Sequence, residues 1–239
     1  MRSGLYVTGT DTGIGKTFAS VALLHALRAR DLRSIGMKPV ASGCERVEKE
    51  WRNDDALALQ AASDPLPDYG DVNPYALPAA TAPEIAAREA CIDIALPRIE
   101  RAYRSLQAQC DVVVVEGVGG WAAPLSPSLD QIDLVRALDL RVVLVVGLRL
   151  GCISHARLTA RAIQADGAML AAWIASEIDS DMADRDAYFE LLRSRIAAPC
   201  VGRLAFVADG DAAKAASSID LGLVWTGAGS AGPVPATHR

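Results

Sequence analysis

The sequence predicts an α/β fold in which a doubly wound, mainly parallel sheet carries helices on both faces. Short runs of Val, Ile and Leu are continuous rather than alternating, which is typical of strands buried on both sides. Helical segments separate these runs, as in repeated βαβ units. With 239 residues, of which 51% are hydrophobic, the chain is long enough for one large core, so we expect a single domain.

The predicted elements alternate along the chain. The strands are the apolar runs Leu5–Thr8, Ser34–Pro39, Val112–Val115, Val142–Val146 and Met169–Ala175, with a short edge strand at Cys200–Val207. The helices are Phe18–Arg30, Asp55–Ala62, Ile92–Gln109, Ile132–Leu138, Ser154–Ala165 and Arg185–Ile196. Residues 64–83 hold five of the 12 prolines, so we expect a connector that lies over the surface. Residues 1–226 should form the domain, and 227–239, rich in Gly, Ala, Pro and Ser, a mobile tail.

Charge and cysteine usage exclude several classes of function. A formal net charge of −5 disfavours nonspecific binding to nucleic acid or to an anionic membrane. The longest apolar stretch, 140–150, contains two arginines and falls short of the roughly 20 residues that cross a bilayer. The five cysteines include no CxxC pair, the three histidines cannot complete a familiar zinc site, and no signal-peptide pattern opens the chain. We therefore expect a reduced, cytoplasmic protein whose partners are small molecules or proteins.

A glycine-rich turn between the first strand and the first helix predicts a phosphate site. Residues 9–17 are GTDTGIGKT. Gly13 and Gly15 allow successive N–H groups to point at phosphate oxygens, at the positive end of the helix dipole. Lys16 can place its charge between the β- and γ-phosphates, and the Thr17 hydroxyl can bind magnesium. This context indicates a P-loop NTPase fold that uses ATP.

The loop departs from the strict P-loop motif. Five residues separate Gly9 from Gly15, so Thr10 stands where the motif has its first glycine. The alternative is an ordinary glycine-rich turn with an incidental lysine, although a helix start does not require so many glycines.

Two acidic positions and a second lysine are expected at the same edge of the sheet. Glu116 follows the strand 112–115, where a carboxylate would meet Thr17 at a magnesium ion. Lys38 ends the second strand and would stabilise charge on transferring oxygens, or else it is an ordinary surface lysine. Asp54 and Asp55 begin a helix and are equally well explained as acids that favour its dipole.

Six segments resemble the dethiobiotin synthetase family. They are YVTGTDTGIGKT (6–17), KPVASG (38–43), RNDDALALQ (52–60), VNPY (72–75), VVEGVGGWAAPL (114–125) and VVGLRLGCISHARLTA (145–160). The resemblance implies a cytoplasmic homodimer with its substrate site at the interface, using ATP and Mg²⁺. The implied reaction inserts CO2 between the two amines of 7,8-diaminononanoate. One amine becomes a carbamate, the carbamate oxygen attacks the γ-phosphorus, and the second amine displaces phosphate from the mixed anhydride.

The resemblance also implies roles for individual residues. Lys38, Lys16 and Thr12 would be catalytic, and Thr17, Asp55 and Glu116 would bind magnesium. The substrate would contact Thr12, Lys38 and Ser42, with its carboxylate received by Gly151, Cys152 and Ile153 of the partner. The nucleotide would contact Gly13, Ile14, Gly15, Lys16, Thr17, Phe18, Asp55, Glu116, Gly117, Val118, Gly119, Ser176, Glu177, Ala205, Phe206 and Val207.

Three positions depart from the family pattern. Ser176 stands where the family commonly has an asparagine that recognises the adenine edge, Ala205 where a proline is common, and Gly13 where a glutamate is frequent. A serine hydroxyl cannot present a donor and an acceptor in one plane as an amide does. We therefore expect a weaker preference for ATP over other nucleoside triphosphates.

A dimeric ATPase switch of the chromosome-partitioning kind is the alternative function. Those proteins carry a signature lysine five residues before the P-loop lysine, where this chain has Asp11. They often add a basic surface or an amphipathic C-terminal helix, whereas this chain is acidic.

Overall fold

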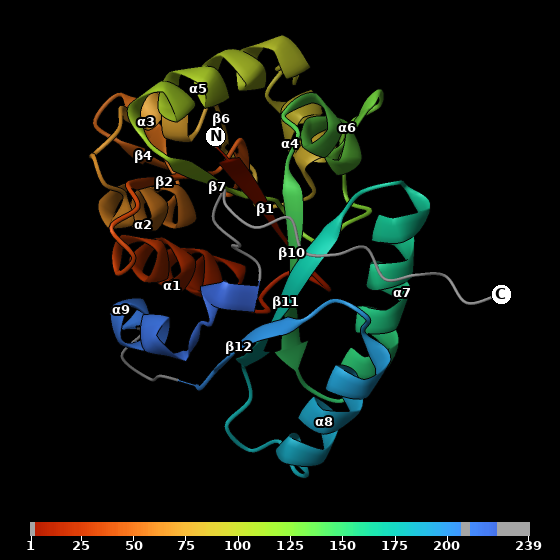
Figure 1. The fold of residues 1–239 in the computed structure, drawn as a ribbon. Helices are drawn as coiled ribbons and strands as arrows, with labels where there is room; N and C mark the ends of the chain where they lie inside the picture. Colours follow the sequence, from red (N-terminus) through yellow and green to blue (C-terminus); the bar gives the residue numbers. More distant parts are fainter. Residues whose placement is uncertain (1–2, 207–210, 224–239) are drawn as a thin grey trace, which may run out of the picture.

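A six-stranded parallel sheet forms the centre of the computed structural model, which describes residues 3–206 and 211–223 (Figure 1). The strand order is β12-β11-β10-β1-β7-β2, and every neighbouring pair is parallel. The strands are β1 (Ser3–Gly9), β2 (Ser34–Met37), β7 (Val112–Glu116), β10 (Arg141–Leu148), β11 (Leu170–Glu177) and β12 (Cys200–Leu204). The predicted doubly wound α/β fold of the P-loop type is confirmed.

Helices cover both faces of this sheet because successive strand residues point to opposite sides. The helices are α1 (Lys16–Arg28), α2 (Asp54–Ala62), α3 (Tyr69–Val72), α4 (Pro83–Glu89), α5 (Leu96–Gln109), α6 (Gln131–Ala137), α7 (Cys152–Ala165), α8 (Arg185–Arg195) and α9 (Ala212–Ala215), with 3₁₀ turns at Ala216–Ser218 and Leu221–Leu223. In β1, Leu5 and Val7 join the core under α1, α2 and α9, whereas Tyr6 joins the core under α5 and α6. Helices α7 and α8 pack over β10 and β11 on that second side. Of the described helices, not one combines the length and apolar character needed to cross a membrane.

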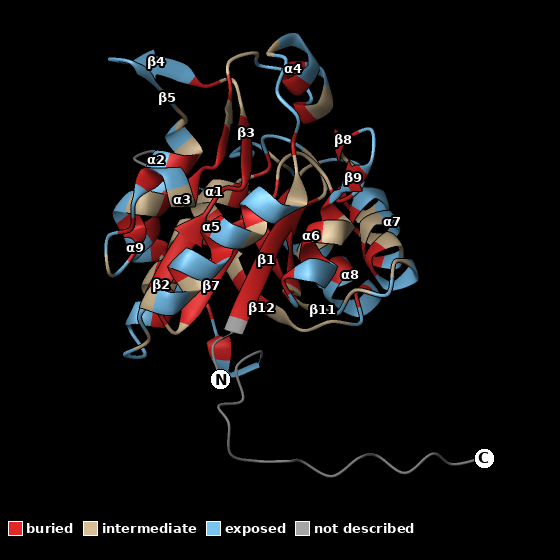
Figure 2. Cartoon of the chain, turned by 90° about the horizontal axis from the view of Figure 1, so that it is seen from above, coloured by how far each residue is buried: buried red, intermediate tan, exposed pale blue. Residues whose placement is uncertain are grey.

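Within the described residues, three small two-stranded sheets lie outside the central one. They are β3 (Val40–Ser42) with β6 (Tyr75–Leu77), β4 (Glu45–Val47) with β5 (Glu50–Arg52), and β8 (Pro124–Ser126) with β9 (Leu129–Asp130). The β4–β5 hairpin is almost wholly exposed and projects from the body of the protein (Figure 2). It joins β3 to α2, and both of these elements contribute residues to the pocket described below.

The prediction for residues 64–83 was wrong in part. This stretch contains α3 and β6, and it buries Tyr69, Val72, Tyr75 and Leu77. The carbonyl of Val72 accepts a hydrogen bond of 2.8 Å from the backbone N–H of Lys38. Prolines separate the apolar residues of this stretch, so no helical or strand period was visible in the sequence.

Several predicted boundaries also need correction. Helix α5 begins at Leu96 rather than Ile92, because Pro97 occupies its first turn and Ala95 is extended. Strand β2 ends at Met37, so Pro39 lies beyond it. The edge strand is confirmed over Cys200–Leu204. Val207 and the predicted tail, 227–239, lie outside the described residues.

Candidate active site

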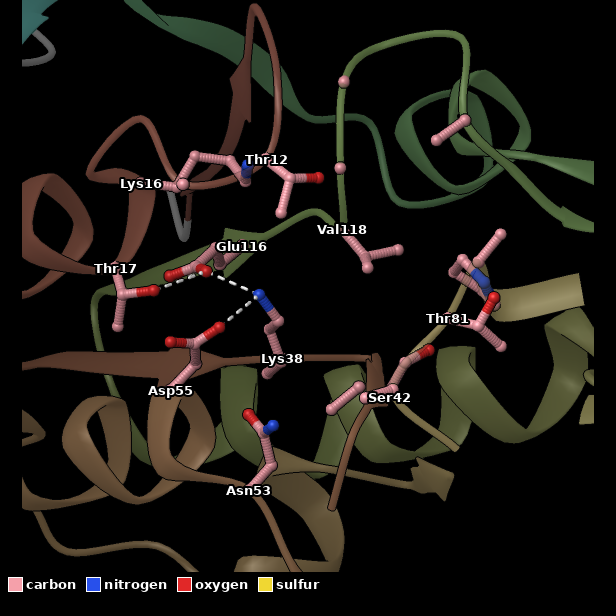
Figure 3. Close-up of a pocket in the computed structure, with 18 of the residues that line it drawn as sticks. Thr12, Lys16, Thr17, Lys38, Ser42, Asn53, Asp55, Thr81, Glu116 and Val118 are labelled. Carbon is pink, nitrogen blue, oxygen red and sulfur yellow. Dashed lines mark hydrogen bonds and ion pairs between the residues drawn. The ribbon is translucent and has the colours of Figure 1, made fainter. Parts of the chain in front are cut away.

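A cavity of about 680 Å³ opens beyond the carboxyl ends of β1, β2 and β7, where ligands bind in open parallel sheets (Figure 3). Most of the predicted phosphate, metal and substrate residues line it. They are Thr12, Gly13, Gly15, Lys16, Thr17, Lys38, Ser42, Asp55, Glu116, Val118 and Gly119. Residues far apart in the sequence therefore converge on one pocket.

The loop between β1 and α1 has the backbone conformation that the glycines predicted. Gly13 has a φ of 70° and Gly15 a φ of 84°, both in the left-handed region that favours glycine. A Cβ on Gly15 would also lie 2.4 Å from the hydroxyl oxygen of Ser176. The side chain of Ile14 points from the loop into the core under α1, and Phe18 packs against the same core. The loop is thus shaped for close approach to phosphate.

Lys16 lies folded against the loop that it follows. Its ammonium donates a hydrogen bond of 2.7 Å to the carbonyl oxygen of Asp11. Burial and the nearby charge of Lys38 lower the pKa of Lys16 from 10.5 to about 8, although Glu116 and Asp55 oppose the shift. An incoming phosphate would stabilise the charged form.

The Lys38 ammonium is the centre of a buried cluster of charges. It lies 2.6 Å from Glu116 Oε1, 3.1 Å from Asp55 Oδ2 and 3.1 Å from the carbonyl oxygen of Gly117 (Figure 3). The Thr17 hydroxyl donates to the same Glu116 oxygen at 3.0 Å. The Lys38 side chain is 4% exposed and that of Glu116 is 0% exposed, so these two charges meet away from water.

Neighbouring amides and hydroxyls fix the residues of this cluster. The Asn73 side chain donates to the carbonyl oxygen of Lys38 at 2.7 Å. The Asn53 side chain accepts from the backbone N–H of Ala56 at 3.2 Å and so caps the helix that carries Asp55. The Tyr69 hydroxyl accepts from the N–H of Asn53 at 2.9 Å and donates to Asn73 Oδ1 at 3.2 Å. One tyrosine therefore links the supports of Lys38 and Asp55.

The electrostatics keep Lys38 and Asp55 charged. Burial acts to lower the pKa of Lys38, but Glu116 and Asp55 outweigh it and the net pKa is raised. Burial acts to raise the pKa of Asp55, but the Lys38 ammonium and hydrogen bonding hold it below its usual value. Lys38 is therefore a buried cation rather than an ordinary surface lysine, and Asp55 faces the site, whereas Asp54 is exposed.

The oxygen atoms around Lys38 fit a magnesium ion. Thr17, Asp55 and Glu116 place one hydroxyl and two carboxylates at this end of the pocket. Glu116 Oε2 is buried and has no hydrogen-bond partner among the residues that the structure describes. Within the same residues, no group of three or more His, Cys, Asp or Glu side chains is placed to hold a metal ion by itself. A partial set of this kind suits Mg²⁺, which keeps several waters and binds substrate phosphates.

Asp11, which forms an ion pair with Arg149, holds the backbone of Thr12. The Thr12 N–H donates to Asp11 Oδ1 at 2.8 Å, and the Arg149 guanidinium pairs with the other carboxylate oxygen. The N–H of Thr12 lowers the pKa of Asp11, and Arg149 adds to this effect. Asp11, which stands where partitioning ATPases carry their signature lysine, thus joins the phosphate loop to the end of β10.

The residues predicted to contact the base lie apart from this pocket. Ser176 is buried at the end of β11 against Gly15, while Ala205 and Phe206 are exposed after β12. The Glu177 carboxylate pairs with Arg185 at 2.6 Å and with Arg203 at 2.7 Å. These arginines hold its pKa below the usual value although burial opposes them. The side chain of Glu177 is therefore engaged within the protein.

The predicted carboxylate turn also lies outside the pocket. Gly151, with a φ of 91°, precedes α7, whose first residues are Cys152 and Ile153. Cys152 is buried, and burial raises the pKa of its thiol. The turn is thus a helix start at which the N–H of Cys152 already donates to the carbonyl oxygen of Arg149 at 3.1 Å, and Cys152 serves as a core residue.

The sequence-based prediction did not include some of the residues that line the pocket. Asn53, Ala80, Thr81, Ala82 and Pro83 line the pocket. Asn53 stood immediately before two acids at a helix start, which is a recognisable capping pattern. The others lie where the sequence predicted a connector, so no pattern pointed to them.

Comparison with known proteins shows which family the sequence resembles. A family model described as an AAA domain matches residues 3–213. The ATP-dependent dethiobiotin synthetase BioD of Xanthomonas euvesicatoria is 62% identical over 216 residues, which cover 90% of this chain and 96% of that protein. The protein of the same name from Xylella fastidiosa is 60% identical over 208 residues, covering 87% and 92%.

Solved structures at lower identity share the fold. A MinC:MinD cell division protein complex from Aquifex aeolicus gives a TM-score of 0.55 at 16% identity, covering 90% of this chain and 86% of that chain. A ParA family ATPase from Chlorobium tepidum gives 0.55 at 13% identity, covering 91% of each chain. These two likenesses concern the fold alone, whereas relatives about 60% identical over nine-tenths of the sequence define the family. The chain belongs to the family of ATP-dependent dethiobiotin synthetases.

Proposed function

We propose that this chain closes the ureido ring of dethiobiotin from 7,8-diaminononanoate, CO2 and ATP, as a cytoplasmic homodimer. The observation that carries the proposal is the buried Lys38 ammonium, held by Glu116, Asp55 and Gly117 at the end of a pocket that also contains the P-loop. All three N–H donors of this ammonium are engaged in the ligand-free protein, so a carbamate and a transferring phosphoryl group would replace some of these partners. Family membership gives the substrates, because the relatives are named dethiobiotin synthetases.

Lys16 and the loop N–H groups would hold the nucleotide phosphates. On binding, the Lys16 ammonium exchanges the Asp11 carbonyl for β- and γ-phosphate oxygens, a stronger, charge-assisted hydrogen bond. Thr17, Asp55 and Glu116 would hold Mg²⁺, which when bound neutralises charge on the β- and γ-phosphates. The unpartnered Glu116 Oε2 supports this assignment.

Lys38, Thr12 and Ser42 would hold the reacting part of the substrate. Ser42 lines the pocket, and its buried hydroxyl has no hydrogen-bond partner within the described part of the chain. One substrate amine adds to CO2 and loses a proton to give a carbamate. The carbamate oxygen attacks the γ-phosphorus and ADP leaves, and the second amine then attacks the carbonyl carbon and expels phosphate. Lys38 stabilises the charge that develops on the carbamate and phosphoryl oxygens.

A second copy of the chain would complete the substrate site. The start of its α7, at Gly151, Cys152 and Ile153, would receive the substrate carboxylate with backbone N–H groups, the N–H of Cys152 exchanging its bond to the Arg149 carbonyl. The partitioning-ATPase alternative keeps only the fold in its favour, because Asp11 pairs with Arg149 where those proteins have a lysine.

Product formation tests the function directly. Purified protein with 7,8-diaminononanoate, labelled bicarbonate, Mg²⁺ and ATP should release labelled dethiobiotin. Lys38→Gln should lower the rate of product formation by about 10²- to 10³-fold, because it removes the charge while leaving an amide donor for Glu116. Lys214→Gln, on α9, is the matched control and should retain the wild-type rate. ATP hydrolysis without dethiobiotin would refute the synthetase function, and wild-type turnover in Lys38→Gln would remove Lys38 from the mechanism.

Nucleotide affinity should depend on the charge of Lys16. Since its pKa is about 8 in the free protein, Lys16 is protonated below that pH and the dissociation constant of ADP should be flat there. Above pH 8 a proton must be taken up on binding, so affinity should fall by up to about tenfold per pH unit until the pKa of the bound form is reached. Calorimetry between pH 7 and 9.5, in buffers of different ionisation enthalpy, measures both effects. Lys16→Arg, which stays charged, should show neither. If ADP binding to the wild-type protein takes up no proton at pH 8.5, the prediction is contradicted.

Base preference should be modest because Ser176 replaces an amide. Losing one or two net hydrogen bonds costs about 1 to 3 kcal/mol, which lowers the preference for ATP over CTP and GTP in kcat/KM by roughly 5- to 150-fold, so we expect that preference to stay below several hundredfold. Ser176→Asn should increase this preference, whereas Ser176→Ala should change it less than about threefold. A wild-type preference of several hundredfold would show that Ser176 does not weaken recognition of adenine.

A further inference from the structure

Gln131, the first residue of α6, donates hydrogen bonds from its buried side-chain amide to several backbone carbonyl oxygens. Its side chain is fully buried, and its Nε2 lies 2.5 Å from the Gly120 oxygen and 3.0 Å from the Val118 oxygen. The carbonyl oxygens of Ala123, at 3.2 Å, and Trp121, at 3.4 Å, complete an arc around the same nitrogen. Two N–H groups can thus satisfy a backbone segment that forms no regular ladder.

The segment held in this way is a wall of the candidate active site. We call residues 117–123 the wall loop, because Val118, Gly119, Gly120 and Ala123 line the pocket. In the view of Figure 3, Val118 lies between Thr12 and Thr81. The loop follows Glu116 directly, so its conformation affects the position of the Glu116 carboxylate at the end of β7.

Tyr6 completes the support from inside the sheet. Its hydroxyl donates to Gln131 Oε1 at 2.5 Å. A Cβ on Gly117 would lie 2.4 Å from that Gln131 oxygen and 2.6 Å from the Tyr6 hydroxyl. The backbone of Gly117 therefore rests directly on the Tyr6–Gln131 hydrogen bond, and the Gly117 carbonyl accepts from Lys38 at 3.1 Å.

The other side of the wall loop rests on the phosphate loop. A Cβ on Gly120 would lie 3.6 Å from the Gly9 oxygen and 3.7 Å from the Thr10 oxygen. A Cβ on Gly119 would lie 3.8 Å from the Thr12 hydroxyl oxygen. The wall loop is thus clamped between Gln131 and the P-loop backbone, with the catalytic candidates on its open side.

Helix α6 does not need the Gln131 side chain to begin. Asp133 already accepts from the backbone N–H of Asp130 at 2.9 Å, which is one half of a capping box. A buried amide pays a desolvation cost that an apolar side chain of equal length would not. The contacts of Gln131 therefore serve the wall loop rather than its own helix.

We propose that Gln131, supported by Tyr6, is a positioning residue that fixes the wall loop so that the Gly117 carbonyl and the Glu116 carboxylate meet Lys38. This inference rests on the proposed synthetase function for its kinetic consequences. Because most phosphate contacts come from the P-loop, and the wall loop adds only Gly117, Val118 and Gly119 to the expected nucleotide contacts, loss of Gln131 lowers kcat by a larger factor than it raises the KM for ATP. A displacement of about 1 Å at reacting groups costs about 10²-fold in rate.

Three substitutions test the role of Gln131. Gln131→Met keeps the length and removes every hydrogen bond, Gln131→Glu keeps an acceptor for Tyr6 but removes the amide donors, and Tyr6→Phe removes only the hydroxyl. We expect kcat for dethiobiotin to fall by about 30- to 100-fold in both Gln131 variants and less in Tyr6→Phe, with the KM for ATP within about threefold of wild type. Hydrogen exchange of the wall loop should accelerate in all three variants, while exchange in β11 and β12, which do not contact Tyr6 or Gln131, stays unchanged.

Gln60→Met is the matched control. Gln60 donates to the Pro67 carbonyl at 2.9 Å and does not line the pocket, so this variant should keep wild-type kcat and wild-type exchange in the wall loop. If Gln131→Met fails to fold, Gln131→Glu and Tyr6→Phe still decide the question.

Two results would overturn the inference. One is a folded Gln131 variant with wild-type kcat and unchanged exchange in the wall loop. The other is faster exchange spread evenly over the sheet with a parallel rise in the KM for ATP, which would indicate a purely structural role. If the wild-type protein makes no dethiobiotin, the proposed function fails, whereas the exchange measurement still tests the positioning role.

Discussion

The buried ion pair between Lys38 and Glu116 is the interaction on which the rest of the site depends. Both side chains are almost fully removed from water, with their charged atoms 2.6 Å apart. Taking either charge out of water alone would cost several kcal/mol, so each is tolerated because the other is present. Asp55, Thr17 and the Gly117 carbonyl supply the further hydrogen bonds that a buried pair requires.

The register of the parallel sheet creates this pair. Met37, the last residue of β2, lies opposite Val115 of β7, so the residues that follow them, Lys38 and Glu116, also come side by side. Val7 of β1 lies opposite Glu116 on its other side, which brings the start of the phosphate loop to the same edge. The ends of three strands therefore bring a lysine, a carboxylate and the P-loop together, although these groups lie far apart in the sequence.

Local patterns predicted the parts of the structure that have local causes. Continuous valines gave β7, and the glycines before Lys16 gave the phosphate loop with its left-handed backbone. Lys38 remained open from its residue type and position, since its charge partner lies 78 residues away. Residue type and position could not separate Asp54 from Asp55; the family resemblance pointed to Asp55, and the structure places its carboxylate 3.1 Å from the Lys38 ammonium. The buried residues of 64–83 and the role of Gln131 had no local pattern, because both depend on carbonyl or side-chain partners that only the folded chain brings near.

A double-mutant cycle on the stability of the ligand-free protein tests the central claim most directly. Free energies of unfolding would be measured by denaturant titration for the wild type, Lys38→Met, Glu116→Gln and the double variant. We predict that Lys38→Met, which leaves Glu116 buried and unpaired, loses about 3 to 5 kcal/mol. The double variant should recover a large part of that loss, giving a coupling energy of about 2 kcal/mol or more. Strictly additive losses, or a loss below about 1 kcal/mol for Lys38→Met, would contradict a site organised around a buried ion pair.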